Sequence, residues 1–203
     1  GHDSSVISWN TFNGKTARSI RSPGGIVLDF SFDPVNKHIL HLVCSDSALY
    51  GYDLKNNTFN RELKSDNYLL NIVFSNDGKY GCYQKGDSTI NIIHMSSSKV
   101  LYRDKVFTDK TSAGGYFSDG SFSPDSRYFV YCGSDSNTII LNLQQWKSLK
   151  LQGGIAKQKS FNSDGSFYIT HYGGNPALVN FSDFDWEKTY NVIYGQTSFE
   201  DWF

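Results

Sequence analysis

Carboxylate side chains recur at one position along this chain of 203 residues. Short polar turns carry Asp3, Asp46, Asp87 and Asp135, and a fifth turn of the same kind carries Asn175. Paired carboxylates can serve acid–base catalysis or bind a metal ion, but no second ligand stands beside these residues. An Asp in a tight turn accepts hydrogen bonds from nearby backbone amides. We therefore interpret all five as structural turn residues.

Histidine offers no metal-binding or catalytic spacing either. His38 and His41 are three residues apart, in or near one expected strand, so their side chains face opposite sides of the pleat. The other histidines stand alone: His2, His94 and His171. No Gly-x-Ser-x-Gly, His-Glu-x-x-His, phosphate-binding loop or dinucleotide fingerprint occurs. We expect no catalytic residue, no metal and no cofactor.

The three cysteines, Cys44, Cys82 and Cys132, are odd in number and 38 and 50 residues apart. They form no Cys-x-x-Cys pair, which argues against structural zinc. Free thiols favour a reducing compartment, so we expect a cytoplasmic or nuclear protein. One disulfide with a spare thiol is the alternative.

Composition restricts the class of protein and its partners. Aromatic residues make up 16% of the chain and the net charge is −1, which excludes intrinsic disorder. The balance of 19 basic and 20 acidic residues gives no electrostatic preference for nucleic acid, so nucleic acid is expected only indirectly, through partner proteins. No apolar run approaches the ~18–20 residues of a membrane span, and no membrane partner is expected.

The turn residues set a period that two further markers share. Successive turns are 43, 41, 48 and 40 residues apart. A Phe precedes the next turn by 13 or 14 residues in four units, and a large apolar residue follows each turn residue by six. The Phe positions are Phe32, Phe74, Phe122 and Phe161, and the apolar positions are Trp9, Tyr52, Ile93, Leu141 and Phe181. A period of this length indicates repeated supersecondary units.

Each unit is typical of a four-stranded antiparallel sheet. The first strand ends at the Phe, as in Val27–Phe32 and Leu69–Phe74, and a turn rich in Asn, Asp or Gly reverses it. The second strand runs to the acidic turn, as in Tyr128–Cys132, and the third runs from that turn to the large apolar residue. A more hydrophilic fourth strand follows. One such sheet cannot bury both of its faces, but stacked sheets can.

These markers resemble the WD-repeat β-propeller family, whose units are ~40–45 residues long. Trp9-Asn10 and Tyr52-Asp53 are the nearest versions of the Trp-Asp dipeptide of that family. The resemblance covers essentially the whole chain, although no unit begins with the Gly-His of the family, so the repeats are degenerate. The resemblance implies an all-β propeller of four-stranded antiparallel blades.

We expect one propeller region over residues 1–203 with about four and a half blades. Their approximate bounds are 1–22 (partial), 23–64, 65–104, 116–151 and 152–194, followed by a tail at 195–203. The resembled family has more blades, so we expect either a fragment of a larger propeller or completion by another chain or segment. A small closed propeller is the third alternative.

The longest interval contains an insertion between residues 104 and 119. In the resembled family such links lie on the top face, where partners dock, and loops that tolerate insertion often carry contacts. Charged and aromatic residues of this link are therefore our candidates for partner binding, although a harmless insertion is the alternative. One aromatic residue just ahead of another inner strand and two aromatic residues at the tail are added to them. They are Asp104, Lys105, Phe107, Lys110, Tyr116, Tyr68, Trp202 and Phe203.

The function that fits these features is a non-catalytic scaffold for protein–protein interaction in a multi-protein complex. A reader of a modified or linear peptide at the top face is the alternative, with Tyr68 and Tyr116 as its aromatic candidates. A hydrolase or ligand-binding propeller with a site in the central channel is a weaker alternative. The expected inner strands supply few chargeable groups for such a site, namely Asp29, Asp119, Lys157 and Lys159.

Overall fold

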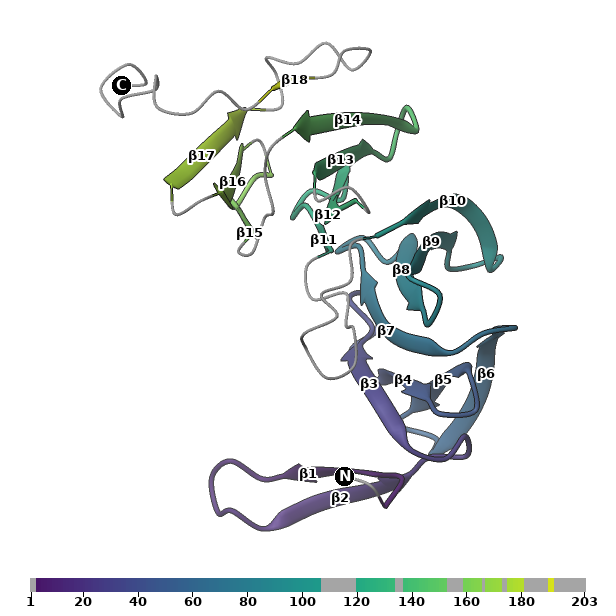
Figure 1. The fold of residues 1–203 in the computed structure, drawn as a ribbon. Coiled ribbons are helices and arrows are strands. Elements are labelled where there is room, and N and C mark those ends of the chain that lie inside the picture. The colour runs from purple at the N-terminus through teal and green to yellow at the C-terminus, as the bar shows by residue number, and fades with distance from the viewer. Residues whose placement is uncertain are drawn as a thin grey trace. The chain divides into compact units, whose positions relative to one another are not determined.

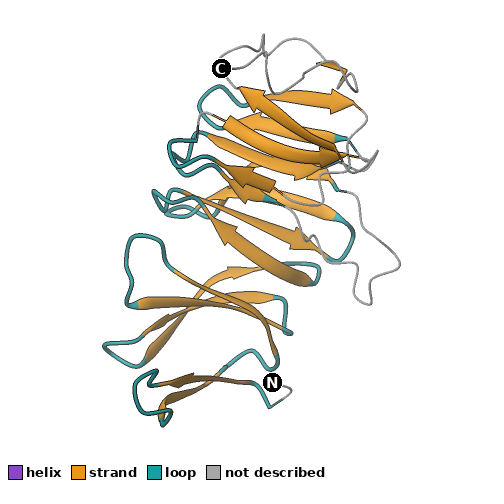
Figure 2. Ribbon diagram, turned by 90° about the vertical axis from the view of Figure 1, so that its left-hand side faces the viewer, coloured by secondary structure: helices purple, strands orange, loops and turns teal. Residues whose placement is uncertain are grey.

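The computed structural model describes residues 3–106, 120–133, 137–152, 159–165, 167–172, 175–180 and 190–191. The chain divides into two compact units, residues 1–118 and residues 119–203. Within the described ranges the secondary structure consists of strands joined by turns, with no helix (Figures 1 and 2).

The first unit holds three antiparallel sheets whose strands follow one another in chain order (Figure 1). A two-stranded sheet contains β1 (Ser5–Trp9) and β2 (Thr16–Arg21). A four-stranded sheet contains β3 (Val27–Phe32), β4 (Ile39–Cys44), β5 (Ala48–Asp53) and β6 (Thr58–Lys64). The next four-stranded sheet contains β7 (Leu69–Phe74), β8 (Tyr80–Lys85), β9 (Thr89–His94) and β10 (Lys99–Lys105).

The second unit repeats the same hairpin pairs. An antiparallel run contains β11 (Ser121–Phe122), β12 (Tyr128–Cys132), β13 (Thr138–Asn142) and β14 (Lys147–Gln152). The short strand β18 (Tyr190–Asn191) pairs with β14 in parallel. A further antiparallel sheet contains β15 (Lys159–Phe161), β16 (Phe167–Tyr172) and β17 (Asn175–Asn180).

The expected all-β class and the division into antiparallel blades of an incomplete propeller are confirmed. The strands predicted at Val27–Phe32, Leu69–Phe74 and Tyr128–Cys132 have those bounds in the structure. The two other expected first strands end at Phe122 and Phe161 as predicted, in β11 (Ser121–Phe122) and β15 (Lys159–Phe161), and the residues 107–119 and 153–158 before them lie outside the described residues.

Apolar side chains on both faces of the β3–β6 sheet hold the first unit together. On one face, Leu40 and Leu42 join Ile20 of β2 in a buried cluster. On the other face, Val43 and Leu49 pack with the β7–β10 sheet, and the cluster also holds Leu69, Ile72, Tyr83 and Ile93. The sheet is thus covered on both sides, as a stacked blade requires.

The first strands of the two four-stranded sheets contact each other and share one irregularity. The register of β3 shifts between Val27 and Asp29, and that of β7 shifts between Leu69 and Asn71, so each strand carries a bulge at the same place in its repeat. The Oδ2 atom of Asp29 accepts a hydrogen bond of 3.0 Å from the backbone amide of Ile72, which ties β3 to β7.

Candidate functional site

The acidic turns place Asp3, Asp46 and Asp87 one residue ahead of a serine with a left-handed backbone. The φ angles are 62° at Ser4, 65° at Ser47 and 64° at Ser88. In the two complete sheets, β4–β5 and β8–β9 are joined by three-residue loops, the geometry of a type I turn followed by a left-handed residue.

The turn carboxylates accept local hydrogen bonds. Oδ1 of Asp3 accepts from the amide of Ser5 at 3.2 Å, and Oδ1 of Asp87 accepts from the amide of Thr89 at 3.1 Å. Hydrogen bonds from Ser5 lower the pKa of Asp3, and those from Thr89 lower the pKa of Asp87. Asp46 differs, since its Oδ2 accepts from the hydroxyl of Tyr50 at 2.7 Å.

The remaining two predicted turn positions lie in the second unit. Asp135 lies outside the described residues. Asn175 is the first residue of β17 and pairs with Tyr172 of β16, so it lies in the strand itself, directly after the residues that connect β16 to β17.

Three of the predicted partner-binding residues lie at the acidic-turn end of the β7–β10 sheet. Tyr68 precedes β7, and Asp104 and Lys105 end β10. Because β7 and β10 form the two edges of an antiparallel sheet, these residues share one end of it but occupy opposite edges. Tyr68 is 54% exposed and Lys105 is exposed, while Asp104 is half-buried. The predictions for Phe107, Lys110, Tyr116, Trp202 and Phe203 fall outside the described residues.

Ile26 lies at the acidic-turn end of the β3–β6 sheet, where it precedes β3, and it is an exposed residue that the sequence interpretation missed. It stands six residues before Phe32, as Tyr68 stands six before Phe74. The carbonyl of Ile26 accepts a hydrogen bond from the amide of Ser45, as the carbonyl of Tyr68 accepts from Gly86, both at 2.8 Å. Ile26 is 38% exposed. The fixed spacing of six residues before the recurring position of the Phe in each repeat is the sequence feature that could have identified Ile26.

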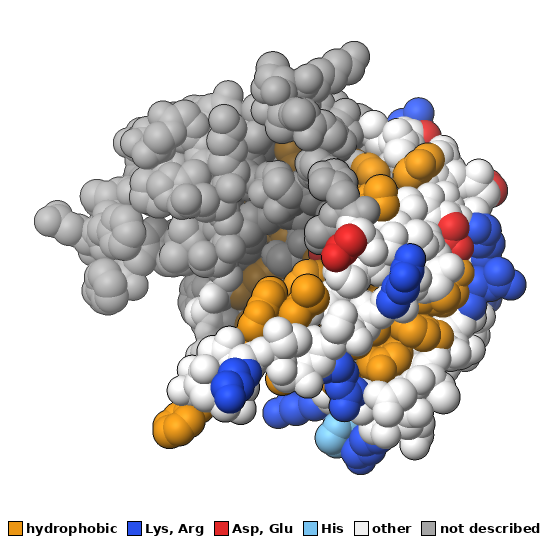
Figure 3. All heavy atoms as spheres, turned by 90° about the horizontal axis from the view of Figure 1, so that it is seen from below, with side chains coloured by type: hydrophobic (Ala, Val, Ile, Leu, Met, Phe, Trp, Pro, Cys, Tyr) orange, Lys and Arg blue, Asp and Glu red, His pale blue; other side chains and the backbone are white. Residues whose placement is uncertain are grey.

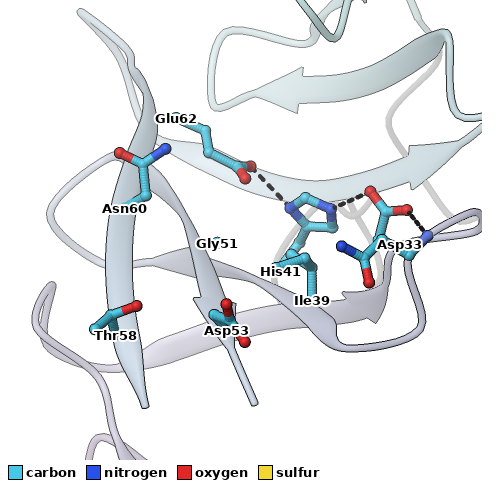
Figure 4. Close-up of a pocket in the computed structure, with 9 residues that line it drawn as sticks. Asp33, Ile39, His41, Gly51, Asp53, Thr58, Asn60 and Glu62 are labelled. Carbon is cyan, nitrogen blue, oxygen red and sulfur yellow. Dashed lines mark hydrogen bonds and ion pairs between the residues drawn. The ribbon is translucent and has the colours of Figure 1, made fainter. Parts of the chain in front are cut away.

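At the opposite end of the β3–β6 sheet, His41 lies buried between two carboxylates (Figure 4). Its Nδ1 lies 2.8 Å from Oε2 of Glu62 on β6, and its Nε2 lies 3.1 Å from Oδ2 of Asp33, which follows β3. The imidazole ring also packs against Phe74 of β7, with ring centroids 4.5 Å apart. The sequence interpretation gave His41 no role, because its partners are distant along the chain.

Local hydrogen bonds fix the position of Asp33. Its Oδ1 accepts from the amides of Val35 at 2.9 Å and Asn36 at 2.6 Å, which is an Asx-type turn. Burial alone would raise the pKa of Asp33, but hydrogen bonds from the Asn36 amide and the His41 ring hold that pKa below its ordinary value.

Both ring nitrogens of His41 face a carboxylate oxygen, and only the imidazolium can donate from both. Burial opposes the charged form, but the hydrogen bonds and negative charges of Glu62 and Asp33 outweigh it and raise the pKa of His41. With both nitrogens occupied and 2% of the residue exposed, His41 is built to hold β3, β4 and β6 together rather than to take a proton from a substrate.

A pocket of about 340 Å³ opens beside this group on the same sheet (Figure 4). Gly51 forms part of its wall, and a Cβ atom there would overlap with Oε1 of Glu62 and lie 3.0 Å from its Cδ. The other lining residues are the apolar Ile39 and the polar Asn36, Asp53, Thr58 and Asn60. The carboxylates of Asp33, Asp53 and Glu62 outnumber the single imidazolium, so the pocket favours a cationic group over an anion.

Within the described ranges, three further features bear on the kind of site: metal ligands, membrane spans and cysteine pairs. These ranges contain no group of three or more His, Cys, Asp or Glu residues arranged to hold a metal ion. They also contain no helix of the length and apolarity needed to cross a membrane. Cys44, Cys82 and Cys132 are buried and none of the three forms a disulfide, in agreement with the expectation of thiols rather than a disulfide.

Comparison with known proteins adds one distant similarity. The chain is 25% identical over 167 residues to eukaryotic translation initiation factor 3 subunit I of Candida glabrata. The match covers 73% of this chain and 46% of that protein, so the chain spans about half the length of the curated relative it matches. No family model matches. The similarity supports the resemblance to WD-repeat proteins.

Proposed function

We propose that this chain is part of a non-catalytic WD-repeat propeller that serves as a protein–protein interaction scaffold in a multi-protein complex. The observation that carries the proposal is the similarity to a protein named as a subunit of translation initiation factor 3. The fold agrees with this role, because stacked four-stranded blades present many turns at one end of the sheets. We place the protein in the cytoplasm or the nucleus, where its free thiols stay reduced.

The binding surface in this proposal is the acidic-turn end. Tyr68 offers an aromatic side chain that is 54% exposed, Ile26 adds apolar surface, and Lys105 adds charge. Aromatic anchors beside charged groups are typical of interface hot spots. Phe107, Lys110, Tyr116, Trp202 and Phe203 stay candidates for partner binding from the sequence alone. Nucleic acid would enter such a complex only through the partner proteins.

The experiment is affinity purification of the full-length protein from its own cells, with mass-spectrometric identification of co-purifying proteins. The double variant Tyr68→Ala with Lys105→Glu is expected to bind at least one partner at least about tenfold more weakly. This corresponds to a loss of ~1.4 kcal/mol of binding free energy. Lys55→Glu is the matched control, because Lys55 is exposed in the turn between β5 and β6, at the other end of its sheet. Recovery of the same partners in equal amounts with the double variant would contradict the proposed surface.

A peptide array separates the scaffold from a peptide reader at the same end. A scaffold that recognises folded surfaces is expected to bind no discrete linear motif, whereas a reader would bind a family of related peptides through an aromatic cage. Binding of one modified peptide that is lost in Tyr68→Ala would replace the scaffold proposal with the reader.

A further inference from the structure

The pocket beside His41 is built on two rows of residues that cross three strands on one face of the β3–β6 sheet (Figure 4). In the first row, His41 of β4 pairs with Gly51 of β5, and Gly51 pairs with Asn60 of β6. The second row pairs residues of the same strands in the same order: Ile39, Asp53 and Thr58. Because the middle of the first row is a glycine, that row has no side chain at its centre, and the sheet is hollowed there.

The neighbouring sheet covers only part of this face. Val43 and Leu49, further along β4 and β5, pack in the buried cluster with the β7–β10 sheet. Phe74 is the last residue of β7, and its ring packs against the ring of His41. Asn60, in the same row as His41, is exposed. The apolar cover therefore ends at His41, and the pocket beyond it is open to solvent.

Negative charge is concentrated in the pocket. Asp33, Asp53 and Glu62 line it against the single imidazolium of His41, and no Lys or Arg is among the described residues of its wall. The whole chain is nearly neutral at −1, and Lys and Arg side chains reach the surface at several places in Figure 3. The negative charge is thus local to this hollow, where it attracts a cation.

The open hydrogen-bond acceptors of the pocket come from β6. Oε2 of Glu62 lies against His41, while Oε1 of the same carboxylate lies over Gly51. Within the described ranges, no other residue makes a hydrogen bond to Oε1 of Glu62, to the Asn60 side chain or to the Thr58 hydroxyl. Three acceptors at alternate positions of one strand therefore line the pocket with hydrogen-bonding capacity to spare.

The two aspartates of the pocket supply charge rather than open acceptors. Oδ1 of Asp53 accepts from the backbone amides of Lys55 at 2.7 Å and Asn56 at 3.2 Å, and its Oδ2 accepts from the side-chain amide of Asn56 at 2.6 Å. Asp33 is engaged by its own turn and by the His41 ring. A cationic ligand would therefore make its hydrogen bonds to β6 and feel the charge of the turns around it.

We propose that this pocket binds the guanidinium group of an arginine side chain that belongs to another protein. A guanidinium presents five N–H donors in a planar fork, which suits a carboxylate oxygen and two neutral acceptors along one strand. It is also more weakly hydrated than an ammonium group, which suits a pocket that stays open on one side. The aliphatic part of the side chain lies on Ile39, which is half-buried in the pocket wall.

The source of the arginine lies outside residues 1–203. All arginines of this sequence fall in the described ranges and none of them lines the pocket: Arg18, Arg21, Arg61, Arg103 and Arg127. Free arginine is a poorer fit than a protein side chain, because its α-carboxylate would approach the negative charge of the pocket. The pocket stands at the β5–β6-turn end of its sheet, so the inference goes beyond the proposed function at the acidic-turn end and does not depend on it.

The test is an NMR titration of the His41 ring and the Gly51 amide in the full-length protein at low ionic strength. The probe is N-acetyl-L-arginine N-methylamide, and the control is the matching citrulline compound, which has the same shape and an uncharged urea group. We expect saturable shifts with a Kd of about 1–10 mM for the arginine probe, and at least about tenfold weaker binding of the citrulline compound. Equal binding of both compounds, or no saturable shift with the arginine probe, would overturn the proposal. Tighter binding of free L-arginine than of the blocked probe would overturn the assignment to a protein side chain.

Opposite charge changes at Asn60 test the same site in a fold that tolerates both, since Asn60 is exposed. Asn60→Asp adds a negative charge at nearly constant size and is expected to lower the Kd of the arginine probe about threefold to tenfold at low salt. Asn60→Lys places an ammonium group in the pocket and is expected to raise that Kd at least about tenfold. The matched controls are Ser19→Asp and Ser19→Lys on exposed Ser19 of β2, where the Kd is expected to change less than about twofold. The same Kd in both Asn60 variants would show that the probe does not enter this pocket, and the proposal would fall.

Discussion

The Nδ1 atom of His41 lies 2.8 Å from Oε2 of Glu62, although 21 residues separate the two along the chain. The contact forms because β4 and β6 both pair with β5, which carries Gly51 between them. His41 pairs with Gly51 on one side, and Gly51 pairs with Asn60 on the other. The glycine leaves room for the Glu62 side chain to cross β5 and reach the imidazole.

Glu62→Gln tests the charged form of His41. The pKa of His41 is raised above 6.5 in the folded protein, so the contribution to stability is fully present below pH 6.5 and is lost as pH rises through the folded pKa. The variant is therefore expected to lower the free energy of unfolding by about 1–3 kcal/mol at pH 6, and by less at pH 9. Urea unfolding at the two pH values measures the difference.

NMR titration of His41 gives the same prediction a direct readout. In the unaltered protein the pKa of His41 is expected above the ordinary value of a histidine, and Glu62→Gln is expected to bring the pKa of His41 down. An equal loss of stability at both pH values, with no change in the His41 titration, would show that the carboxylate charge has no effect on the imidazole.

Gly51→Ala tests the passage of Glu62 across β5. The new Cβ would overlap with Oε1 of Glu62, so the carboxylate must leave the His41 ring. We expect a loss of about 1–2 kcal/mol of unfolding free energy and a lower pKa of His41. The control is Gly51→Ala in a Glu62→Ala background, where the methyl group meets no carboxylate and is expected to be close to neutral. A loss of equal size in both backgrounds would contradict this account.

The interior of each repeat was predictable because it depends on neighbours along the chain. The Phe, the turn after it and the turn acid stand at fixed offsets, which defined β3 and β7 with their bounds. His41 was not predictable in the same way, since its partners come from a turn eight residues before it and a strand 21 residues after it. The contact between His41 and Glu62 depends on the register of the strands and on the glycine of β5 that the Glu62 side chain crosses. Neither of these leaves a periodic pattern in the sequence.

Asp29 tests the connection between the first strands of two neighbouring sheets. Asp29→Ala removes the acceptor of the Ile72 amide and is expected to cost about 1–3 kcal/mol of unfolding free energy, with faster hydrogen exchange at Ile72. Asp29→Asn keeps a carbonyl oxygen at the same place and is expected to retain most of the protection at Ile72. If hydrogen exchange at the Ile72 amide is equally fast in both variants, the acceptor oxygen at position 29 is not what protects that amide.

Ser47→Gly tests the backbone of the acidic turns. Ser47 has a φ of 65°, a conformation that costs a residue with a Cβ atom about 1–2 kcal/mol and costs glycine nothing. Glycine also loses more conformational entropy on folding, which offsets part of the gain. The expected net effect is a stabilisation of up to about 1 kcal/mol, measured by urea unfolding.

Ser45→Gly in the same turn is the matched control for Ser47. The Oγ atom of Ser45 accepts a hydrogen bond of 3.0 Å from the amide of Ile26 and donates one of 3.3 Å to the carbonyl of Gly24. Its loss is expected to destabilise the protein by about 1 kcal/mol, because the link before β3 loses the two hydrogen bonds that the Ser45 hydroxyl makes and keeps only backbone hydrogen bonds to the turn. Opposite signs at two serines that stand two residues apart would show that backbone conformation governs Ser47 and side-chain hydrogen bonding governs Ser45. Equal destabilisation by both substitutions would mean that the left-handed conformation of Ser47 is held at no cost.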